Sequence, residues 1–238
     1  MASTDSTSNS MFGFLFFILI ILYVIHTYWS SNAEPTLTNP MNYMFWLLIV
    51  ISQFLWGAMS FLSDLPQSTA FINSGIAVFT TWTLLFIPMF TINDSNVNRA
   101  AGLNFSQEMN SIFSNVVGYY WVSADADNIL SKLNAIDIHN IDKPANNDLV
   151  AAKILYGEIK NNKTLIINQL TPSNFECQWE TLFEYLFKIA GQNKAELDKT
   201  KIALKNVVFQ KYSIGKCFWY FYTAIICFSL SIYLMSIL

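Results

Sequence analysis

The chain has 238 residues, of which 53% are hydrophobic, 16% aromatic and only 12% charged. That charged share is about half of the usual one, and a formal net charge of −3 does not suit a surface that binds nucleic acid through its phosphates. All thirteen Lys and Arg residues lie between Arg99 and Lys216. This distribution excludes one large water-soluble core and predicts an all-α, multi-pass membrane protein that carries one polar domain.

The first apolar block, Met11–Trp29, follows a polar tail over residues 1–10. A secretory signal peptide is the competing interpretation, but such peptides have a basic start and a shorter apolar core. The tail contains no basic residue, and about 20 apolar residues cross a bilayer, so we expect a retained transmembrane helix. His26 lies near its end, where an interfacial residue is favoured over a proton site.

Two further apolar blocks, Tyr43–Leu62 and Ala70–Ile92, are joined by a link that contains Pro66. Because the link is short, these blocks are predicted to form an antiparallel hairpin of transmembrane helices. The Gln53 amide is expected to bond a neighbouring helix, and Pro88 to kink the third span. Small residues that would allow close backbone approach are Gly57, Ala58 and Ser60 on one helix and Ser74, Gly75 and Ala77 on the other.

The predicted polar domain covers residues 93–216, where apolar side chains recur at three- and four-residue spacing, as in helices. Asp125 is expected to cap a helix, Ser173 and Glu176 have the spacing of a capping box, and Gly191 is expected to end the helix which that box begins. Residues 163–170 fit a helix or a strand. The expected helices are Phe105–Val122, Asp125–Ile138, Asp148–Ile159, Ser173–Ala190 and Lys194–Tyr212.

The last of these helices leads through Gly215 into a fourth apolar span, Cys217–Leu238. Aromatic residues at the start of the span are typical of the boundary between water and lipid, and Lys side chains can extend from there to headgroups. The excess of Lys over residues 194–216 fits either an anionic leaflet or an ordinary solvated helix face. The candidate membrane-interface residues are Lys211, Lys216, Trp219, Tyr220 and Tyr222.

Basic residues near the ends of spans favour the cytosolic side of a membrane. Arg99, Lys211 and Lys216 are the basic residues closest to the predicted spans. We therefore expect the polar domain on the cytosolic side, with three spans before it and one after it.

No spacing in the sequence is typical of catalysis or of a cofactor or metal site, and we expect a protein that is not an enzyme. The eight glycines are never closer than sixteen residues, which excludes a P-loop and a dinucleotide fingerprint. His139 has no second His or Cys nearby, so a solvated loop is favoured over a metal site. Cys177 is expected to pack in a helix. Three glycosylation sequons, at Asn93, Asn104 and Asn162, are interpreted as chance matches in an Asn-rich chain.

Three adjacent aromatic residues, Tyr119, Tyr120 and Trp121, follow Gly118 within a predicted helix, and one helix face cannot bury all three. Core packing is the favoured interpretation. The alternatives are contact with a membrane surface and a partner-docking surface, since Tyr and Trp are enriched at binding hot spots.

The stretch NVVGYYWVS, Asn115–Ser123, followed by the short helix NILSKLNAI, resembles virion membrane proteins of large icosahedral DNA viruses, of the chlorella-virus and giant-virus kind. The resemblance covers residues 105–138 and the layout of the spans. It implies a structural role in the internal membrane of the virion, with other membrane or minor capsid proteins as partners and no catalytic residues. The alternatives are an accessory subunit of a large membrane complex, such as a mitochondrial one, and a transporter or channel, which the nearly charge-free spans disfavour. The sequence leaves the oligomeric state open.

Overall fold

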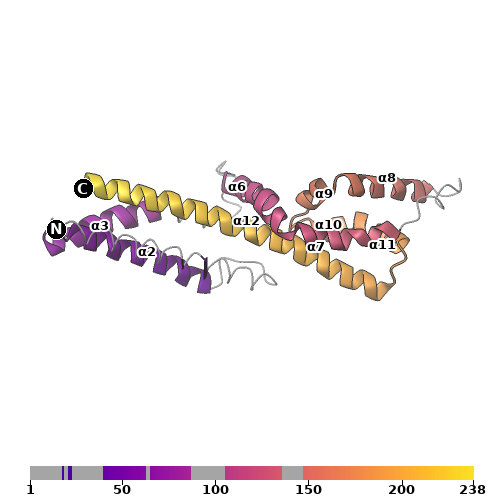
Figure 1. The fold of residues 1–238 in the computed structure, drawn as a ribbon, viewed down its shortest axis with the longest axis horizontal. Coiled ribbons are helices and arrows are strands. Elements are labelled where there is room, and N and C mark those ends of the chain that lie inside the picture. The colour runs from indigo at the N-terminus through magenta and orange to yellow at the C-terminus, as the bar shows by residue number, and fades with distance from the viewer. Residues whose placement is uncertain (1–17, 19–20, 23–39, 63–64, 87–104, 136–146) are drawn as a thin grey trace. The chain divides into compact units, whose positions relative to one another are not determined.

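The structure is a computed structural model that describes residues 18, 21–22, 40–62, 65–86, 105–135 and 147–238 (Figure 1). Every regular element in these ranges is a helix, so the predicted all-α class is confirmed. Apart from residues 18, 21 and 22, the first predicted span lies outside the described residues, as do Pro88 and His139. The chain divides into two compact units: unit 1 extends to Asn110 and resumes at Lys216, and unit 2 is Ser111–Gly215. The domain boundaries expected at residues 93 and 216 stay predictions.

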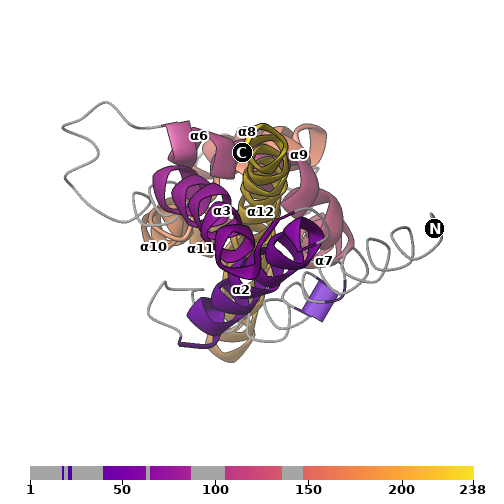
Figure 2. The ribbon, with the colours of Figure 1, turned by 90° about the vertical axis from the view of Figure 1, so that its left-hand side faces the viewer.

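Unit 1 contains a hairpin of helices beside the C-terminal part of the long helix α12, where Trp56 of the hairpin stacks on Phe228 (Figure 2). The hairpin consists of α2 (Pro40–Phe61), α3 (Gln67–Thr81) and a π-helical turn, η1 (Trp82–Phe86), that continues α3. As predicted, small residues bring the hairpin together. A Cβ added to Gly57 would lie 2.5 Å from Ser74 Oγ, and that hydroxyl donates to the Phe54 carbonyl oxygen at 2.7 Å.

Two of the described helices are long and apolar enough to cross a membrane: α2, over Met44–Phe61, and α12. Alone, α3 has 15 residues, a length of about 22 Å against a hydrocarbon thickness of about 30 Å. The described residues therefore contain two candidate spans rather than the four that the sequence predicts.

The helix α12 runs without a break from Lys194 to Ile237, a length of 44 residues (Figure 1). The helix expected to end near Tyr212 and the fourth span expected from Cys217 are therefore parts of one helix. A Gly inside a helix costs about 1 kcal/mol relative to Ala, but here a Cβ at Gly215 would overlap with the backbone of Ser114. Close packing, and not a helix end, accounts for this glycine.

The predicted break before Asp125 is also wrong. The residues from 105 to 135 follow one another without interruption in helical conformation, and Asp125 is an exposed residue within the run. No Gly or Pro lies between residues 119 and 135 to end the helix. The elements are α6 (Phe105–Phe113), the π-helical turn η3 (Ser114–Gly118), α7 (Tyr119–Ser131) and the 3₁₀ turn η4 (Lys132–Ala135).

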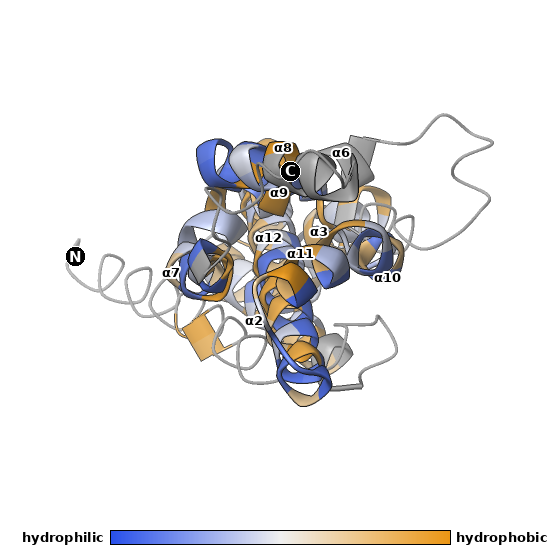
Figure 3. Cartoon of the chain, turned by 90° about the vertical axis from the view of Figure 1, so that its right-hand side faces the viewer, coloured by the Kyte–Doolittle hydropathy of each residue, from blue (hydrophilic) through white to orange (hydrophobic). Residues whose placement is uncertain are grey.

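The remaining helices of unit 2 match the expected positions. Residues 163–170, for which helix and strand were both open, form a helix, and hydrophilic and hydrophobic residues share α7, α10 and α11, as in amphipathic helices (Figure 3). The elements are α8 (Asn147–Asn161), α9 (Lys163–Gln169), α10 (Phe175–Gln178), the π-helical turn η6 (Trp179–Phe183) and α11 (Glu184–Ile189).

The capping box at Ser173 and Glu176 is not formed. Asn174 occupies the N-cap of α10, and its Oδ1 accepts a hydrogen bond from the Thr171 backbone N–H at 2.8 Å. The reciprocal bonds of a capping box occur instead at the start of α12, where Asn193 and Glu196 each accept from the other's backbone N–H at 3.0 Å.

The end of α11 is as predicted. Gly191 has a φ of +85°, which a glycine adopts without steric cost. The Gln192 N–H donates to the Phe187 carbonyl oxygen at 3.1 Å, and the Gly191 N–H donates to the Lys188 carbonyl oxygen at 3.0 Å. This pair of bonds is a Schellman motif, and it satisfies carbonyl groups at the helix end.

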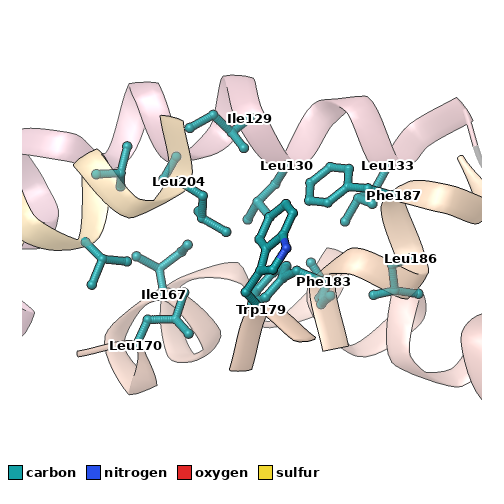
Figure 4. Close-up of a cluster of buried hydrophobic side chains, with 14 of the residues drawn as sticks. Ile129, Leu130, Leu133, Ile167, Leu170, Trp179, Phe183, Leu186, Phe187 and Leu204 are labelled. Carbon is teal, nitrogen blue, oxygen red and sulfur yellow. The ribbon is translucent and has the colours of Figure 1, made fainter. Parts of the chain in front are cut away.

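Unit 2 has an aromatic core (Figure 4). Every fourth residue from Phe175 to Phe187 is aromatic and buried, and neighbouring rings stack with centroids 6.3 to 6.5 Å apart. A step of four residues advances about 40° beyond one turn of an α-helix, and the wider π turn at Trp179–Phe183 compensates for part of that drift. The rings share this core with aliphatic residues of other elements. These are Ile129 and Leu130 on α7, Leu133 on η4, Ile167 on α9 with Leu170 directly after it, and Leu204 and Val208 on α12.

Candidate functional site

The elements of unit 2 meet where the η3 turn crosses α12. A Cβ added to Gly118 would overlap with the carbonyl oxygen of Lys211, and one added to Gly215 would overlap with Ser114. The two contacts pair Ser114 with Gly215 and Gly118 with Lys211, so the helices run antiparallel here with their backbones in contact. We call these four residues the helix crossing.

The π turn at the crossing contributes a backbone acceptor. Hydrogen bonds in a π turn close over five residues, and such turns are frequent at functional sites. The carbonyl oxygen of Asn115, within this turn, accepts a hydrogen bond from Asn168 Nδ2 at 3.1 Å. The bond joins the crossing to the end of α9.

Lys211 lies at the centre of this arrangement, with only 1% of its surface exposed. Its Nζ donates to the carbonyl oxygens of Ile167 at 2.8 Å, Leu170 at 3.0 Å and Asn168 at 3.2 Å, and lies 3.3 Å from Asn115 Oδ1. These carbonyls belong to the C-terminal turn of α9, where acceptors lack partners within the helix and the helix dipole is negative. The ammonium group therefore caps α9 from a different helix.

This geometry corrects the expected role of Lys211. Its ammonium group points into unit 2 and cannot extend to lipid headgroups while it makes these bonds. None of its four acceptors is a carboxylate, so its charge is balanced by dipoles alone. Burial lowers the pKa of Lys211 to about 8, because the charged form loses its hydration.

The other candidate interface residues belong to unit 1. Trp219 and Tyr220 are buried, with Tyr220 in an edge-to-face contact with Trp46 at 6.3 Å. Lys216 is buried too, and its Nζ lies 6.0 Å from the centre of the Tyr220 ring, within the range of a cation–π contact. Tyr222 is exposed. The belt residues therefore pack largely on protein, and their place at a membrane boundary stays a prediction.

The three adjacent aromatic residues of α7 differ from one another. Tyr119 is partly buried, and its hydroxyl accepts a hydrogen bond from Thr164 Oγ1 of α9 at 2.9 Å. Tyr120 and Trp121 are exposed, at 81% and 54% of their surface. Core packing, the favoured interpretation, is therefore wrong for these two, and their role in partner docking stays a prediction.

Sequence reasoning missed Ser114, Asn115 and Asn168. The spacing Ser114-x-x-x-Gly118 is a small-residue pattern of close helix contacts, so the crossing has a signal in the sequence. The bonds between Asn168, Asn115 and Lys211 have none, because they depend on where α9 ends relative to α12.

The site holds groups in place and shows no reactive arrangement. In the part of the chain that the structure describes, no three His, Cys, Asp or Glu side chains gather to bind a metal ion. Cys177 is exposed rather than packed in a helix, which corrects the expectation from the sequence. Comparison with known proteins yields no matching family model, no similar curated protein and no similar solved structure.

Proposed function

We propose that this chain is a non-enzymatic, multi-pass membrane protein that holds a helical domain at a bilayer surface and docks a protein layer there. The internal membrane and capsid of a large icosahedral DNA virus are the setting that the sequence resemblance suggests. The proposal rests mainly on the surface of unit 1, where large apolar side chains are exposed.

In unit 1, many buried positions hold small or polar residues, beside a few large ones such as Ile49 and Trp219. The outward-facing side chains are large and apolar, and exposing one Leu or Ile to water forgoes about 1.5–3 kcal/mol. A surface of this kind is stable only when lipid or protein covers it. The exposed large apolar residues of α2 are Met44, Leu47, Leu48, Ile51, Leu55 and Met59, and further ones in unit 1 are Leu62, Ile72, Ile76, Phe79, Leu84, Ile225, Leu230, Ile232 and Ile237.

The polar groups of unit 1 also suit a lipid environment. Hydroxyl groups there donate to carbonyl oxygens of their own helix: Thr81 to Ala77 at 2.7 Å and Ser231 to Cys227 at 2.8 Å. A bilayer core offers no water as a partner, so polar groups must be satisfied internally. This bonding supports the α3–η1 helix and the end of α12 as spans.

Membrane insertion is tested by washing membranes that contain the full-length chain with alkaline carbonate and with urea. We expect the protein to stay in the membrane pellet through both washes, and release into the supernatant would contradict the proposal. The exposed Cys177 reports sidedness once Cys217 and Cys227 are replaced by Ala. An impermeant thiol reagent should label it in vesicles whose cytosolic face is outward and spare it in vesicles of the opposite orientation.

Docking is proposed at Tyr120 and Trp121, because exposed aromatic side chains on a fixed platform are typical anchors of protein interfaces. A membrane-held domain has lost part of its rotational freedom, which reduces the entropy cost of meeting a fixed partner. An anchor worth about 2 kcal/mol corresponds to roughly 30-fold in affinity.

The docking test compares what co-purifies with the full-length protein in its native lipid. Shell proteins should be retained by the wild type and by the control Asn128→Ala, which changes an exposed residue of α7, and lost from Tyr120→Ala and Trp121→Ala. Retention by all four proteins would place the docking surface elsewhere. Recovery of membrane-complex subunits instead of shell proteins would favour the accessory-subunit alternative.

A further inference from the structure

We infer that the shell protein that docks at Tyr120 and Trp121 presents a basic segment, whose Arg or Lys side chain lies on these rings and pairs with the Asp125 carboxylate. The inference rests on the docking role proposed above for the two aromatic residues, and it adds the chemistry of the partner. All three residues belong to α7, within unit 2, and all three are exposed, as is Ala124. We call these four residues the α7 face.

The helical repeat brings the residues of the α7 face together. Trp121 and Asp125 are four positions apart, as are Tyr120 and Ala124, and residues at this spacing are neighbours on a helix surface, with Cβ atoms about 5–6 Å apart. Ala124 has the smallest side chain of the four. A partner side chain that reaches Ala124 therefore meets both rings within one helical turn and has the carboxylate of the next residue beside it.

The charge of Asp125 is not balanced within the described part of the chain. None of the described residues forms an ion pair with Asp125, whereas Asp127 on the same helix pairs with Lys163 at 3.0 Å. The nearest basic residue in sequence, Lys132, is seven positions away, and its Nζ donates to Thr200 Oγ1 on α12 at 3.3 Å. The α7 face therefore combines exposed aromatic rings with a negative charge.

This combination is suited to a cation. The ring faces of Trp and Tyr attract Arg and Lys, more strongly once water is excluded, and a carboxylate adds a charge-assisted hydrogen bond. Arg fits best, because its planar guanidinium group stacks on a ring and also forms hydrogen bonds to a carboxylate. An apolar segment would remove the hydration of Asp125 without replacing it, and an acidic segment would be repelled. A basic segment is therefore the partner that the α7 face favours.

The first test measures how much shell protein the full-length chain retains in its native lipid over a range of NaCl concentrations. The variants are Asp125→Asn, Asp125→Lys and Asp125→Glu, which keeps the charge. Asp198→Asn is the matched control, because it removes the same charge from an exposed position on α12. We expect the apparent affinity to fall about tenfold in Asp125→Asn and further in Asp125→Lys. It should not change in Asp125→Glu or Asp198→Asn, and added salt should weaken the wild type more than Asp125→Asn.

The second test identifies the segment that lies on the α7 face. The photo-cross-linking amino acid benzoylphenylalanine takes the place of Ala124 in the full-length protein, and mass spectrometry locates the cross-linked peptide after illumination of the complex in native lipid. We expect a peptide of a shell protein with an Arg or Lys within four residues of the cross-link.

The outcomes separate this inference from the docking proposal. If Tyr120→Ala and Trp121→Ala lose the shell proteins while Asp125→Asn and Asp125→Lys retain them, the inference is wrong and the docking proposal stands. A cross-linked peptide without a basic residue, or a cross-link to lipid, also contradicts the inference. A cross-link to a second copy of this chain would overturn the assignment of the partner. If the aromatic variants retain the shell proteins too, the docking proposal fails and the inference fails with it.

Discussion

Unit 1 and unit 2 differ in the residues of their interiors, although both bury aromatic rings, such as Trp219 in unit 1. Unit 2 buries Trp179 and Phe183 and keeps its ion pairs at the surface, as between Lys205 and Glu176. Unit 1 buries Gln53 and Ser74 together with several alanines and exposes large aliphatic side chains. The proposed membrane insertion of unit 1 accounts for this difference, because water drives apolar groups inward, whereas lipid leaves them on the outside.

The two units must therefore be stabilised by different forces. Burial of apolar surface from water stabilises unit 2. That force is absent between helices in lipid, where close packing of small residues and interhelical hydrogen bonds remain. Substitutions of the same kind should have different effects in the two units, and the predictions below use this difference.

The largest effect is expected from emptying the core of unit 2. Phe183→Ala removes a fully buried ring and should destabilise unit 2 by about 3–5 kcal/mol. Leu47→Ala, on the exposed face of α2, removes a similar apolar group and should change the stability of unit 1 by less than about 0.5 kcal/mol. The urea midpoint of each variant in detergent micelles, followed by pulse proteolysis, measures the first value, and resistance to extraction from membranes checks the second. Similar losses of stability in both units would mean that the same force stabilises both of them.

The second effect comes from the buried charge of Lys211. Its pKa in the folded protein, about 8, is below the ordinary value of 10.5. Between these values the unfolded chain holds the proton and the folded chain does not, so the free energy of unfolding should rise with pH across this window and stay constant below it. The full rise is about 3 kcal/mol.

The measurement is the urea midpoint of unit 2 at pH values from 7 to 10.5, for the wild type and for Lys211→Met. The variant has no titrating group at this position, so the difference between the two curves isolates Lys211. A difference that does not change with pH would mean that the ammonium bonds to the α9 carbonyls hold the pKa at its ordinary value.

The third effect concerns the helix crossing. Gly118→Ala places a methyl group where the backbone of Lys211 lies, and overpacking of this kind costs about 1–3 kcal/mol. Gly157→Ala is the matched control, because nothing lies within 4 Å of that position in α8, and it should stabilise the protein by up to about 1 kcal/mol. Opposite shifts of the urea midpoint confirm the crossing, and a gain at both positions would refute it.

The helices of unit 2 could be predicted from the sequence because their apolar periodicity survives in the structure. By their spacing, Leu204, Val207, Val208 and Lys211 share one side of a helix, and all four side chains are buried. The pattern could not show that a Lys on that side meets the C-terminal carbonyls of α9. A Lys near an apolar span looks the same in sequence whether it reaches for headgroups or for backbone oxygens.

Local signals failed where tertiary contacts decided the outcome. The residues around Gly215 separate two expected segments, yet α12 runs through them as one helix, and the glycine allows the contact with Ser114. Ser173 has the spacing of a capping box, but the turn from Thr171 to Asn174 closes through its own hydrogen bonds. The box between Asn193 and Glu196 has the same kind of spacing and does form, so spacing alone did not discriminate between the two.

The smallest effect is expected at Gln53, where unit 1 depends on a polar contact. Trp82 Nε1 donates to Gln53 Oε1 at 2.6 Å, and Gln53 Nε2 donates to the Phe228 carbonyl oxygen at 3.3 Å, so one amide joins α2, η1 and α12. Interhelical hydrogen bonds in membranes contribute about 0.6–1.7 kcal/mol. Gln53→Leu keeps the side-chain volume but removes both hydrogen bonds. Although the substitution makes the interior more apolar, we expect unit 1 to open more often.

Cys227 offers a readout for this loosening, because it is fully buried in unit 1. In a background without Cys177 and Cys217, the rate at which a membrane-permeant maleimide labels Cys227 reports how often unit 1 opens. Gln53→Leu should raise that rate roughly 3- to 20-fold, the equivalent of the free energy of the lost bonds. The control Ser229→Ala removes an exposed hydroxyl that bonds only its own helix, to the Ile225 carbonyl, and should leave the rate unchanged. A slower rate in Gln53→Leu would mean that unit 1 is stabilised by apolar burial, as unit 2 is, and that water rather than lipid surrounds it.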